Sequence, residues 1–390
     1  MTLLGKGCRN IFIFATIIIL FSFFYVDNYS HSTGFSKKDF LVQPDTNWAP
    51  YKEKVEVKGI YLTGNTVGYK DRFDELIRFI DTTEINAVVI DIKDDLGEIT
   101  YNTDLDYLKD IGATNNIRIE DIGEVMSILR EKDIYPIARI VTFKDRNLAS
   151  KRPDLAVKSK EGTVWRDNKG DAWLNPYNKE SWEYPVKIAE EAALKGFKEI
   201  QFDYVRFPTD GKRDFIDYGQ AIKDIPMEEA IGEFLKYAKE RLEPLGVYVS
   251  ADVFGLVTTS EDDMGLGQYL ETIATSVDIV SPMVYPSHYA MGSYGVRYPD
   301  AEPYKIVYKS VTTAVNRIDN IHTNDRKAII RPWLQDFSAP WLKKQYGSYY
   351  TKYGEKQIKA QIQACYDSGV REWIFWNASN KYTLDGYERK

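Results

Sequence analysis

From Val55 onwards, short apolar segments alternate with longer segments in which apolar residues recur every three or four positions. The short runs predict buried strands, and the periodic segments predict helices that cover them. We identify eight strand segments, at residues 57–64, 87–95, 135–143, 199–207, 247–255, 278–286, 327–335 and 372–379. Eight strands separated by helices are typical of a closed (β/α)8 barrel, the TIM barrel, rather than an open doubly wound sheet. The pattern therefore predicts an α/β fold of this type.

The fourth strand segment shows the alternation most clearly. Ile200 and Phe202 share one face, while Gln201 and Asp203 share the other. A barrel strand turns its large apolar side chains towards the covering helices, so Asp203 is expected to point into the barrel near the carboxyl end of its strand. TIM-barrel enzymes place catalytic groups there, although a structural Asp paired with Arg206 would give the same pattern.

The same alternation places other charged residues inside the barrel. The predicted inward residues are Asp91, Lys93, Asp95, Arg139, Asp203, Asp252 and Arg331. Asp203 and Asp252 lie on strands that are expected to be neighbours, about 4.8 Å apart. At equal height, their carboxyl groups could approach the roughly 5–5.5 Å separation that retaining glycosidases use. The alternative is an ion-pair network with a structural role.

Long segments follow several strands and are expected to crowd the carboxyl face of the barrel. Residues 144–179 contain no convincing helical pattern, and their Trp165 and Trp173 predict an ordered flap over the barrel mouth. Residues 97–116, 208–226, 286–303 and 336–354 form the other long loops.

Composition and motifs narrow the chemistry. The chain has 390 residues, a net charge of −7 and a pI of about 5.3, so its composition does not indicate nucleic-acid binding. Its 2 cysteines and 3 well-separated histidines provide neither a disulfide framework nor metal-ligand spacing, so we predict no metal and no cofactor. A G-x-S-x-G nucleophile motif and a glycine-rich phosphate loop are also missing from the sequence. Inward carboxylates beside many aromatic residues favour glycoside hydrolysis.

The N-terminal region has the pattern of an export signal or a membrane anchor. Lys6 and Arg9 precede an uncharged apolar run over residues 11–26, and no small-residue cleavage site follows it. We therefore predict a signal anchor or signal peptide at residues 1–26, a linker at 27–54, and the barrel domain at 55–390. An uncleaved anchor would hold the protein in the cell membrane as a single-pass protein with an extracytoplasmic barrel, and cleavage would make it secreted.

Five segments in order along the chain carry a family resemblance: VVIDIKDD, IARIVTFKD, WRDNKGDAWLNP, EIQFDYVRFP and SPMVYPSHY. Together, over roughly residues 57–382, they resemble a bacterial family of extracytoplasmic glycoside hydrolases related to the α-amylase-like barrels. In α-amylase-type barrels a nucleophilic Asp ends strand four and a Glu acid ends strand five, and these positions correspond to Asp203 and Asp252. Asp252 departs from the usual Glu, and Gln201 stands where those barrels have Arg. Asp336 lies near the end of strand seven, but the alternation of that strand places it on the outward face. An α-glucan substrate does not follow from the resemblance.

We predict a glycosidase that acts on an extracellular or cell-envelope polysaccharide or oligosaccharide, with Asp203 as nucleophile or principal carboxylate and Asp252 as acid/base. The residues expected to bind substrate are Asp91, Lys93, Arg139, Arg206, Tyr285, His288, Arg331, Trp333 and Trp376. A non-catalytic carbohydrate-binding or scaffolding barrel at the cell surface is the main alternative. A lyase or transferase on the same barrel is a third.

Overall fold

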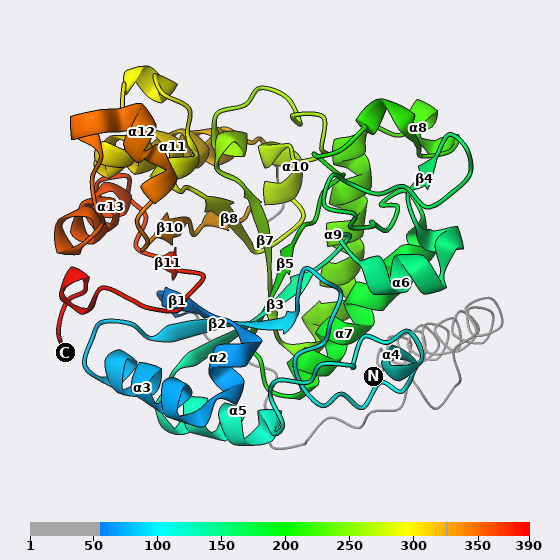
Figure 1. Cartoon of the computed structure of the whole chain (residues 1–390), viewed down its shortest axis with the longest axis horizontal. Helices are drawn as coiled ribbons and strands as arrows, with labels where there is room; N and C mark the ends of the chain where they lie inside the picture. Colours follow the sequence, from blue (N-terminus) through cyan, green and yellow to red (C-terminus); the bar gives the residue numbers. More distant parts are fainter. Residues whose placement is uncertain (1–54, 324–326) are drawn as a thin grey trace, which may run out of the picture. The chain divides into compact units, whose positions relative to one another are not determined.

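A computed structural model of the chain describes residues 55–323 and 327–390, and a closed parallel barrel lies at its centre (Figure 1). The barrel strands are β1 (Lys58–Leu62), β2 (Ala87–Lys93), β3 (Tyr135–Val141), β5 (Glu199–Asp203), β7 (Tyr248–Phe254), β8 (Ile279–Met283), β9 (Ile329–Ile330), β10 (Trp333–Gln335) and β11 (Trp373–Trp376). β1 pairs with β11, and β8 pairs with both β9 and β10, so the ring closes. The predicted (β/α)8 barrel is confirmed, with all eight strand positions.

The seventh strand position is split into two short strands. β9 pairs with β8 through Ile330 and Val280, and β10 pairs with β8 through Trp333 and Met283. Pro332 lies between the two strands and has no backbone N–H to donate to the ladder. The predicted continuous strand over residues 327–335 is therefore interrupted.

Helices surround the strands on the outside of the barrel (Figure 1). The covering helices are α3 (Lys70–Asp81), α5 (Ile122–Glu131), α7 (Glu183–Leu194), α9 (Met227–Leu242), α10 (Leu270–Ala274), α11 (Pro303–Asp319) and α13 (Glu355–Asp367). Short helices α2 (Gly64–Gly68), α4 (Tyr107–Asp110), α8 (Ala221–Asp224) and α12 (Lys343–Tyr346) lie in the loops. In α3 the apolar stripe Phe73, Leu76, Ile77 and Ile80 is buried, as its spacing predicts.

The fourth barrel strand, β5, ends at Asp203, earlier than the predicted residue 207. Tyr204 has a φ of 50°, in the left-handed region, so the extended backbone cannot continue through it. Within the strand the predicted alternation holds. Phe202 packs outwards with its ring 5.4 Å from that of Phe234 on α9, while Gln201 points inwards and donates to Ser281 Oγ at 3.4 Å.

The described residues after β11 form no α-helix, and this C-terminal segment covers the barrel instead. Tyr387 is buried, with its ring 5.6 Å from Phe79 of α3 and 5.3 Å from Phe375 of β11. Its hydroxyl donates to Asp336 Oδ2 at 2.9 Å, and Thr383 donates to both carboxylate oxygens of Asp336. Asp336 therefore points outwards, as its parity predicts, and fastens this segment to the barrel.

Residues 144–179 form an ordered segment, but the prediction that they contain no helix is wrong. Helix α6 (Arg146–Lys151) begins after Asp145, whose side chain accepts a hydrogen bond from Leu148 N. Further along, β4 (Lys158–Ser159) pairs antiparallel with β6 (Ile216–Asp217) of the loop that follows β5. The helix escapes prediction because six residues are too few to show an apolar period.

The predicted anchor at residues 1–26 and the predicted linker at 27–54 lie outside the described residues. Within residues 55–323 and 327–390, no helix combines the length and apolar character needed to span a bilayer.

Candidate functional site

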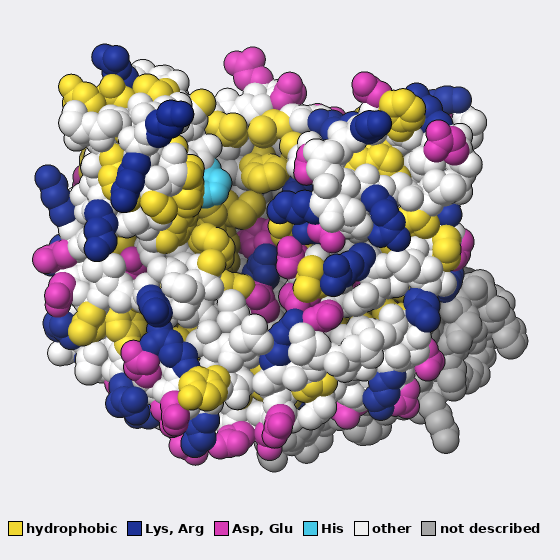
Figure 2. Space-filling model, in the orientation of Figure 1, with side chains coloured by type: hydrophobic (Ala, Val, Ile, Leu, Met, Phe, Trp, Pro, Cys, Tyr) yellow, Lys and Arg dark blue, Asp and Glu magenta, His cyan; other side chains and the backbone are white. Residues whose placement is uncertain are grey.

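The carboxyl ends of the strands meet at a hollow in the molecular surface. Figure 2 shows this hollow, with acidic and basic side chains at its floor and hydrophobic side chains gathered along one wall. The floor consists of three aspartates and one arginine that the alternation pattern predicted to point inwards.

Arg139 of β3 is the centre of this charged group. Its NH1 lies 2.5 Å from Asp91 Oδ1, and its Nε and NH2 lie 3.0 and 2.5 Å from Asp203 Oδ2. The same Nε lies 4.0 Å from Asp252 Oδ2. One guanidinium thus brings three buried carboxyl groups from β2, β5 and β7 together.

The strand register explains why two of these acids are at the same height. Phe202 on β5 is level with Ala251 on β7, so the residues that follow, Asp203 and Asp252, are also level. Both side chains point inwards, and both oxygens that face Arg139 lie within 4.0 Å of one nitrogen. The arrangement therefore meets the condition of equal height for a carboxyl pair.

Asp252 is the more deeply buried member of the pair, with 1% of its surface exposed. Trp333 Nε1 donates to its Oδ1 at 2.7 Å, and Gln268 Nε2 donates to its backbone oxygen at 3.1 Å. Burial raises the pKa of Asp252 well above its usual range; the charge of Asp203 adds to the rise and the charge of Arg139 opposes it. Asp252 therefore keeps its proton to a higher pH than an exposed aspartate does.

Asp203 has a different environment. Its Oδ2 accepts two hydrogen bonds from Arg139, and its Oδ1 accepts one from the Tyr204 backbone N–H at 2.6 Å. The left-handed backbone at Tyr204 is a sparsely populated conformation of the kind that often occurs at functional sites. Three donors fix the orientation of the Asp203 carboxylate, so the two members of the pair differ chemically.

Asp91 completes the floor, and its neighbour Tyr61 was missed by the sequence analysis. The Tyr61 hydroxyl donates to Asp91 Oδ2, and the Arg139 guanidinium lies 5.8 Å from the centre of the Tyr61 ring. Burial raises the pKa of Asp91, with Arg139 opposing the shift. The alternation of the first strand would have found Tyr61, since it lies two residues after Gly59 on the inward face.

Aromatic side chains build the wall beside this floor. The predicted residues Tyr285 and Trp376 contact each other at 5.7 Å between ring centres, and Trp333 borders Tyr61 at 6.2 Å. Two residues of the loop after β10 extend the wall: Phe337, 5.3 Å from Trp376, and Trp341, 6.3 Å from Phe337. These two were not predicted, because strand alternation gives no information about side chains in loops.

His288 lies at the outer edge of the same wall. Its partly exposed ring is 5.5 Å from Tyr285 and 6.2 Å from Phe337. Partial burial lowers the pKa of His288. The structure therefore groups this predicted residue with the aromatic wall.

Lys93 does not join the site, and its predicted role in binding substrate is corrected. The β2–β3 pairing contains an irregularity between Asp91 and Lys93, which breaks the alternation at that point. Lys93 is fully buried, with Nζ 2.8 Å from Asp145 Oδ2 and 2.6 Å from Val141 O. It is sealed from any substrate.

Arg331 points into the barrel as predicted but lies at the wrong end for substrate binding. Its NH1 lies 2.7 Å from Glu199 Oε2, and its Nε lies 2.8 Å from Glu372 Oε2. Glu199 is the first residue of β5 and Glu372 precedes β11, so this buried ion pair occupies the amino end of the barrel. Alternation specifies the face of a strand, but it leaves the height unspecified.

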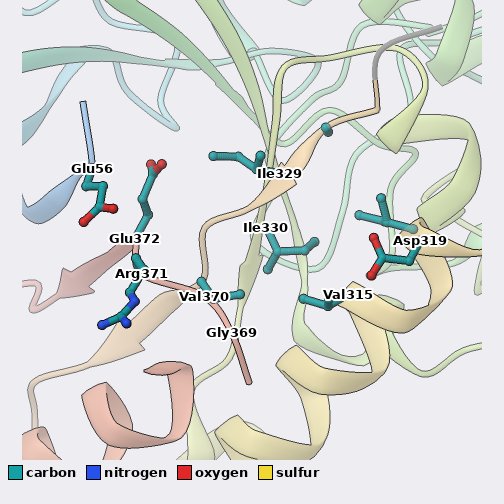
Figure 3. A pocket seen from close by; sticks show the side chains of 11 residues that line it. Glu56, Val315, Asp319, Ile329, Ile330, Gly369, Val370, Arg371 and Glu372 are labelled. Atoms are coloured by element: carbon teal, nitrogen blue, oxygen red, sulfur yellow. The ribbon is translucent and has the colours of Figure 1, made fainter. Parts of the chain in front are cut away.

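A second hollow of about 300 Å³ opens beside these amino ends. Figure 3 shows its apolar lining, including Ile329, Ile330 and Val370, with Glu372 at one side. Glu372 is already bonded to Arg331, and the paired aspartates are at the opposite end of the strands. The candidate site is therefore the carboxyl-end hollow. Among the described residues, no group of three or more His, Cys, Asp or Glu side chains is arranged to hold a metal ion.

Several solved structures are similar to this chain. A hypothetical protein from Ruminiclostridium thermocellum is 44% identical over 50% of this chain and 97% of its own, with a TM-score of 0.46. The PgaB (BpsB) glycoside hydrolase domain from Bordetella bronchiseptica is 14% identical, with a TM-score of 0.58 over 83% of this chain and 93% of its own. A GH20 exo-β-N-acetylglucosaminidase from Vibrio harveyi is also 14% identical, with a TM-score of 0.52 over 83% of this chain and 50% of its own. The two matches at 14% identity show a likeness of fold alone.

A comparison with curated protein sequences gives no match. Residues 59–382 match the family model described as "Putative glycosyl hydrolase domain", which spans nearly the whole barrel. The chain therefore belongs to this family of glycosyl hydrolase domains.

Proposed function

We propose that this protein is a glycoside hydrolase that cleaves an extracellular or cell-envelope polysaccharide through Asp203 and Asp252. The observation that carries the proposal is the pair itself: two buried carboxyl groups, level on adjacent strands, with different surroundings. Hydrolysis of a glycosidic bond needs one carboxylic acid that still holds its proton and one carboxylate that faces the sugar. Family membership supports a carbohydrate substrate.

In this proposal Asp252 is the general acid and Asp203 is the nucleophile. As the bond from the anomeric carbon to the leaving oxygen breaks, Asp252 gives its proton to that oxygen and an Asp203 oxygen bonds to the carbon. Water then attacks the glycosyl ester, and its proton passes to Asp252, which restores both groups. Arg139 orients Asp203 and Asp91 throughout, because it holds both carboxylates.

The aromatic wall would position the sugar chain over the pair. Sugar rings present apolar faces that stack on aromatic side chains, and Trp341 has 59% of its surface exposed beside Phe337. Tyr285 and Trp376 continue the wall from Phe337 towards the floor. This continuity supports a chain-like substrate.

A carbohydrate-binding or scaffolding barrel without turnover is the second candidate. It is favoured by the ion pairing of Arg139 with both Asp91 and Asp203, which satisfies these carboxylates without a substrate. Both candidates predict that sugars bind at the mouth, and only the first predicts cleavage.

Asp203→Asn tests the proposal after a glycan panel has identified a cleaved substrate. An amide of the same shape cannot form the glycosyl ester, so turnover should fall by a factor of about 10³ or more. Stability should change little, because Arg139 remains paired with Asp91. Asp95→Asn is the matched control: Asp95 lies at the rim, bonded to Lys144, and its loss should leave most activity intact.

Release of reducing ends and the melting temperature are measured on the same preparations. Unchanged turnover in Asp203→Asn would show that Asp203 is not the nucleophile. A wild-type protein that binds glycans of the panel but cleaves none would support the second candidate.

We also propose that the barrel acts outside the cytoplasmic membrane, held there by residues 1–26. The support is the charge and hydropathy pattern of that segment.

A further inference from the structure

Arg206 occupies an aromatic box next to the proposed catalytic pair. Its guanidinium carbon lies 4.9 Å from the centre of the Trp173 ring, 5.0 Å from Tyr204 and 4.9 Å from Phe254. Only 8% of its surface is exposed. Three rings from the flap, the end of β5 and the end of β7 thus hold one cation in a fixed place.

The guanidinium of Arg206 has no carboxylate partner among the described residues, unlike the other buried cations near the mouth. Arg139 is paired with Asp91 and Asp203, and Lys144 lies 3.1 Å from Asp95 and 3.0 Å from Asp171. A buried cation without a direct ion pair is costly, and burial lowers the pKa of Arg206, while the more distant carboxylates of Asp203 and Asp167 oppose that shift.

Arg206 also retains unused hydrogen-bond donors. NH1 donates to Phe207 O at 3.0 Å and to Thr209 Oγ1 at 3.2 Å, whereas a guanidinium has five N–H groups. Within the described part of the chain, Nε and NH2 have no protein acceptor, and they are not among the polar atoms that are sealed from solvent. The free edge of the planar group is therefore available to a ligand.

Arg206 lies close to the proposed catalytic pair, where the substrate would bind. Arg206 follows Asp203 by three residues, and the negative charge of Asp203 acts on the Arg206 guanidinium. Lys144 contacts the same Tyr204 ring as Arg206, with its Nζ 5.2 Å from the ring centre. Figure 2 shows Lys and Arg side chains at the wall of the hollow, opposite the hydrophobic wall. A sugar held at the pair would have a cationic surface on this side.

We infer that Arg206 binds an acidic group on a sugar next to the scissile bond, so that the substrate is an acidic polysaccharide. This inference rests on the proposed function. The planar fork of Arg matches the two oxygens of a carboxylate and equally those of a sulfate or phosphate group. The ligand class is therefore a glycan that carries oxyanions, and the substrate supplies the direct ion-pair partner that Arg206 lacks among the described residues.

The test measures glycan binding by the full chain carrying Asp203→Asn, which prevents cleavage during titration. The carboxylate arm compares hyaluronan, alginate and polygalacturonate oligosaccharides with their carboxyl-reduced forms. The sulfate arm compares dextran sulfate with dextran. We expect at least one acidic glycan to bind roughly 10- to 100-fold more tightly than its neutral form, the range of one or two charge-assisted hydrogen bonds.

Arg206→Gln should abolish this preference, while Lys212→Gln should preserve it. Lys212 is an exposed cation on the same loop, with its amine 5.8 Å from the centre of the Phe215 ring, so the control removes equal charge outside the box. Arg206→Lys retains the charge and should keep part of the preference if Arg206→Gln proves too unstable to study.

Equal binding of acidic and neutral forms, no binding of any acidic glycan, or an undiminished preference in a folded Arg206→Gln protein would overturn the inference. These readouts are independent of catalysis. Cleavage of a neutral glycan would refute the acidic substrate but leave the hydrolase proposal intact. Arg206-dependent binding of an acidic glycan without any cleavage would refute the hydrolase proposal but leave the binding role of Arg206 intact.

Discussion

The proton of Asp252 links the stability of the fold to the proposed chemistry. Burial raises the pKa of Asp252 from the ordinary value near 4, and the unfolded chain returns it to that value. Between the two pKa values the folded state binds more protons than the unfolded state, so this group makes stability fall as the pH rises. Such a cost is common where a catalytic acid must remain protonated.

Asp252→Asn should separate these two effects. The amide keeps the oxygen that accepts from Trp333 Nε1 but never ionises. We expect the variant to melt at a higher temperature than the wild type at pH 8 and to lose this advantage at pH 4, while its turnover is low at every pH. Wild-type turnover should fall as the pH rises through the raised pKa of Asp252, because the general acid loses its proton.

Thermal melts of both proteins from pH 4 to pH 9 provide the check. If the melting temperatures of wild type and variant differ by the same amount at every pH in this range, Asp252 titrates normally and is not the acid. Asp95→Asn, which changes a half-exposed acid at the rim, is the reference for a general effect of charge removal.

Strand alternation predicted some of the inward side chains correctly and others wrongly. Alternation placed Asp203, Asp252 and Arg139 on the inward face because all three lie on regular strands with one apolar face. It failed at Lys93, where an irregularity in the strand pairing breaks the period. At Arg331 the predicted face was right, but the residue lies at the amino end of the barrel. The position of a residue along the barrel axis depends on the register between paired strands, and a single sequence does not show this register directly.

At the scale of elements, strand positions were easier to predict than strand ends. Apolar runs mark each strand, but the backbone at Tyr204 ends β5 early and Pro332 divides the seventh strand. The aromatic residues Phe337 and Trp341 escaped prediction because they lie in a loop, where neither period applies. Helices were found where their stripes were long, as in α3, and missed where they were short, as in α6.

The C-terminal segment takes the place of the eighth covering helix, and Tyr387 is its main anchor. Tyr387→Ala removes a buried ring that contacts Phe79 and Phe375 and leaves Asp336 without one donor. We expect a loss of about 3–5 kcal/mol in the free energy of unfolding, the usual cost of deleting a large buried aromatic side chain.

Urea unfolding measures this loss. Leu384→Ala is the matched control, since Leu384 lies in the same segment with 39% of its surface exposed and should change stability by less than about 0.5 kcal/mol. Similar small losses in both variants would show that the segment does not act as part of the barrel cover.

In the whole molecule, the barrel fold determines where the site lies but not which reaction takes place there. TIM barrels place their sites at the carboxyl ends of the strands, so the position of the hollow follows from the fold. The reaction follows from the side chains there, and barrels of this kind serve many reactions. The assignment to a family of glycosyl hydrolase domains narrows the class of reaction. In our proposal, the choice of sugar depends on loop residues such as Arg206 and Trp341.

In our proposal the N-terminal segment determines where this site meets its substrate, and this location can be tested directly. Residues 11–26 carry no charge, and Lys6 and Arg9 precede them, which favours a cytoplasmic N-terminus. We expect full-length protein in a bacterial host to stay in the membrane fraction after an alkaline wash, with Met1 or Thr2 as its first residue. Protease added to intact spheroplasts should reach the barrel.

A variant without residues 1–26 is the control and should be found in the cytosol, protected from the added protease. Replacing Lys6 and Arg9 with Glu tests orientation, since removal of the flanking positive charge should lower the fraction of barrels that protease reaches. A mature start between Asp27 and Ser36 would show that the segment is a cleaved signal. The enzyme would then act as a secreted protein, able to reach polysaccharide at a distance from the cell that makes it.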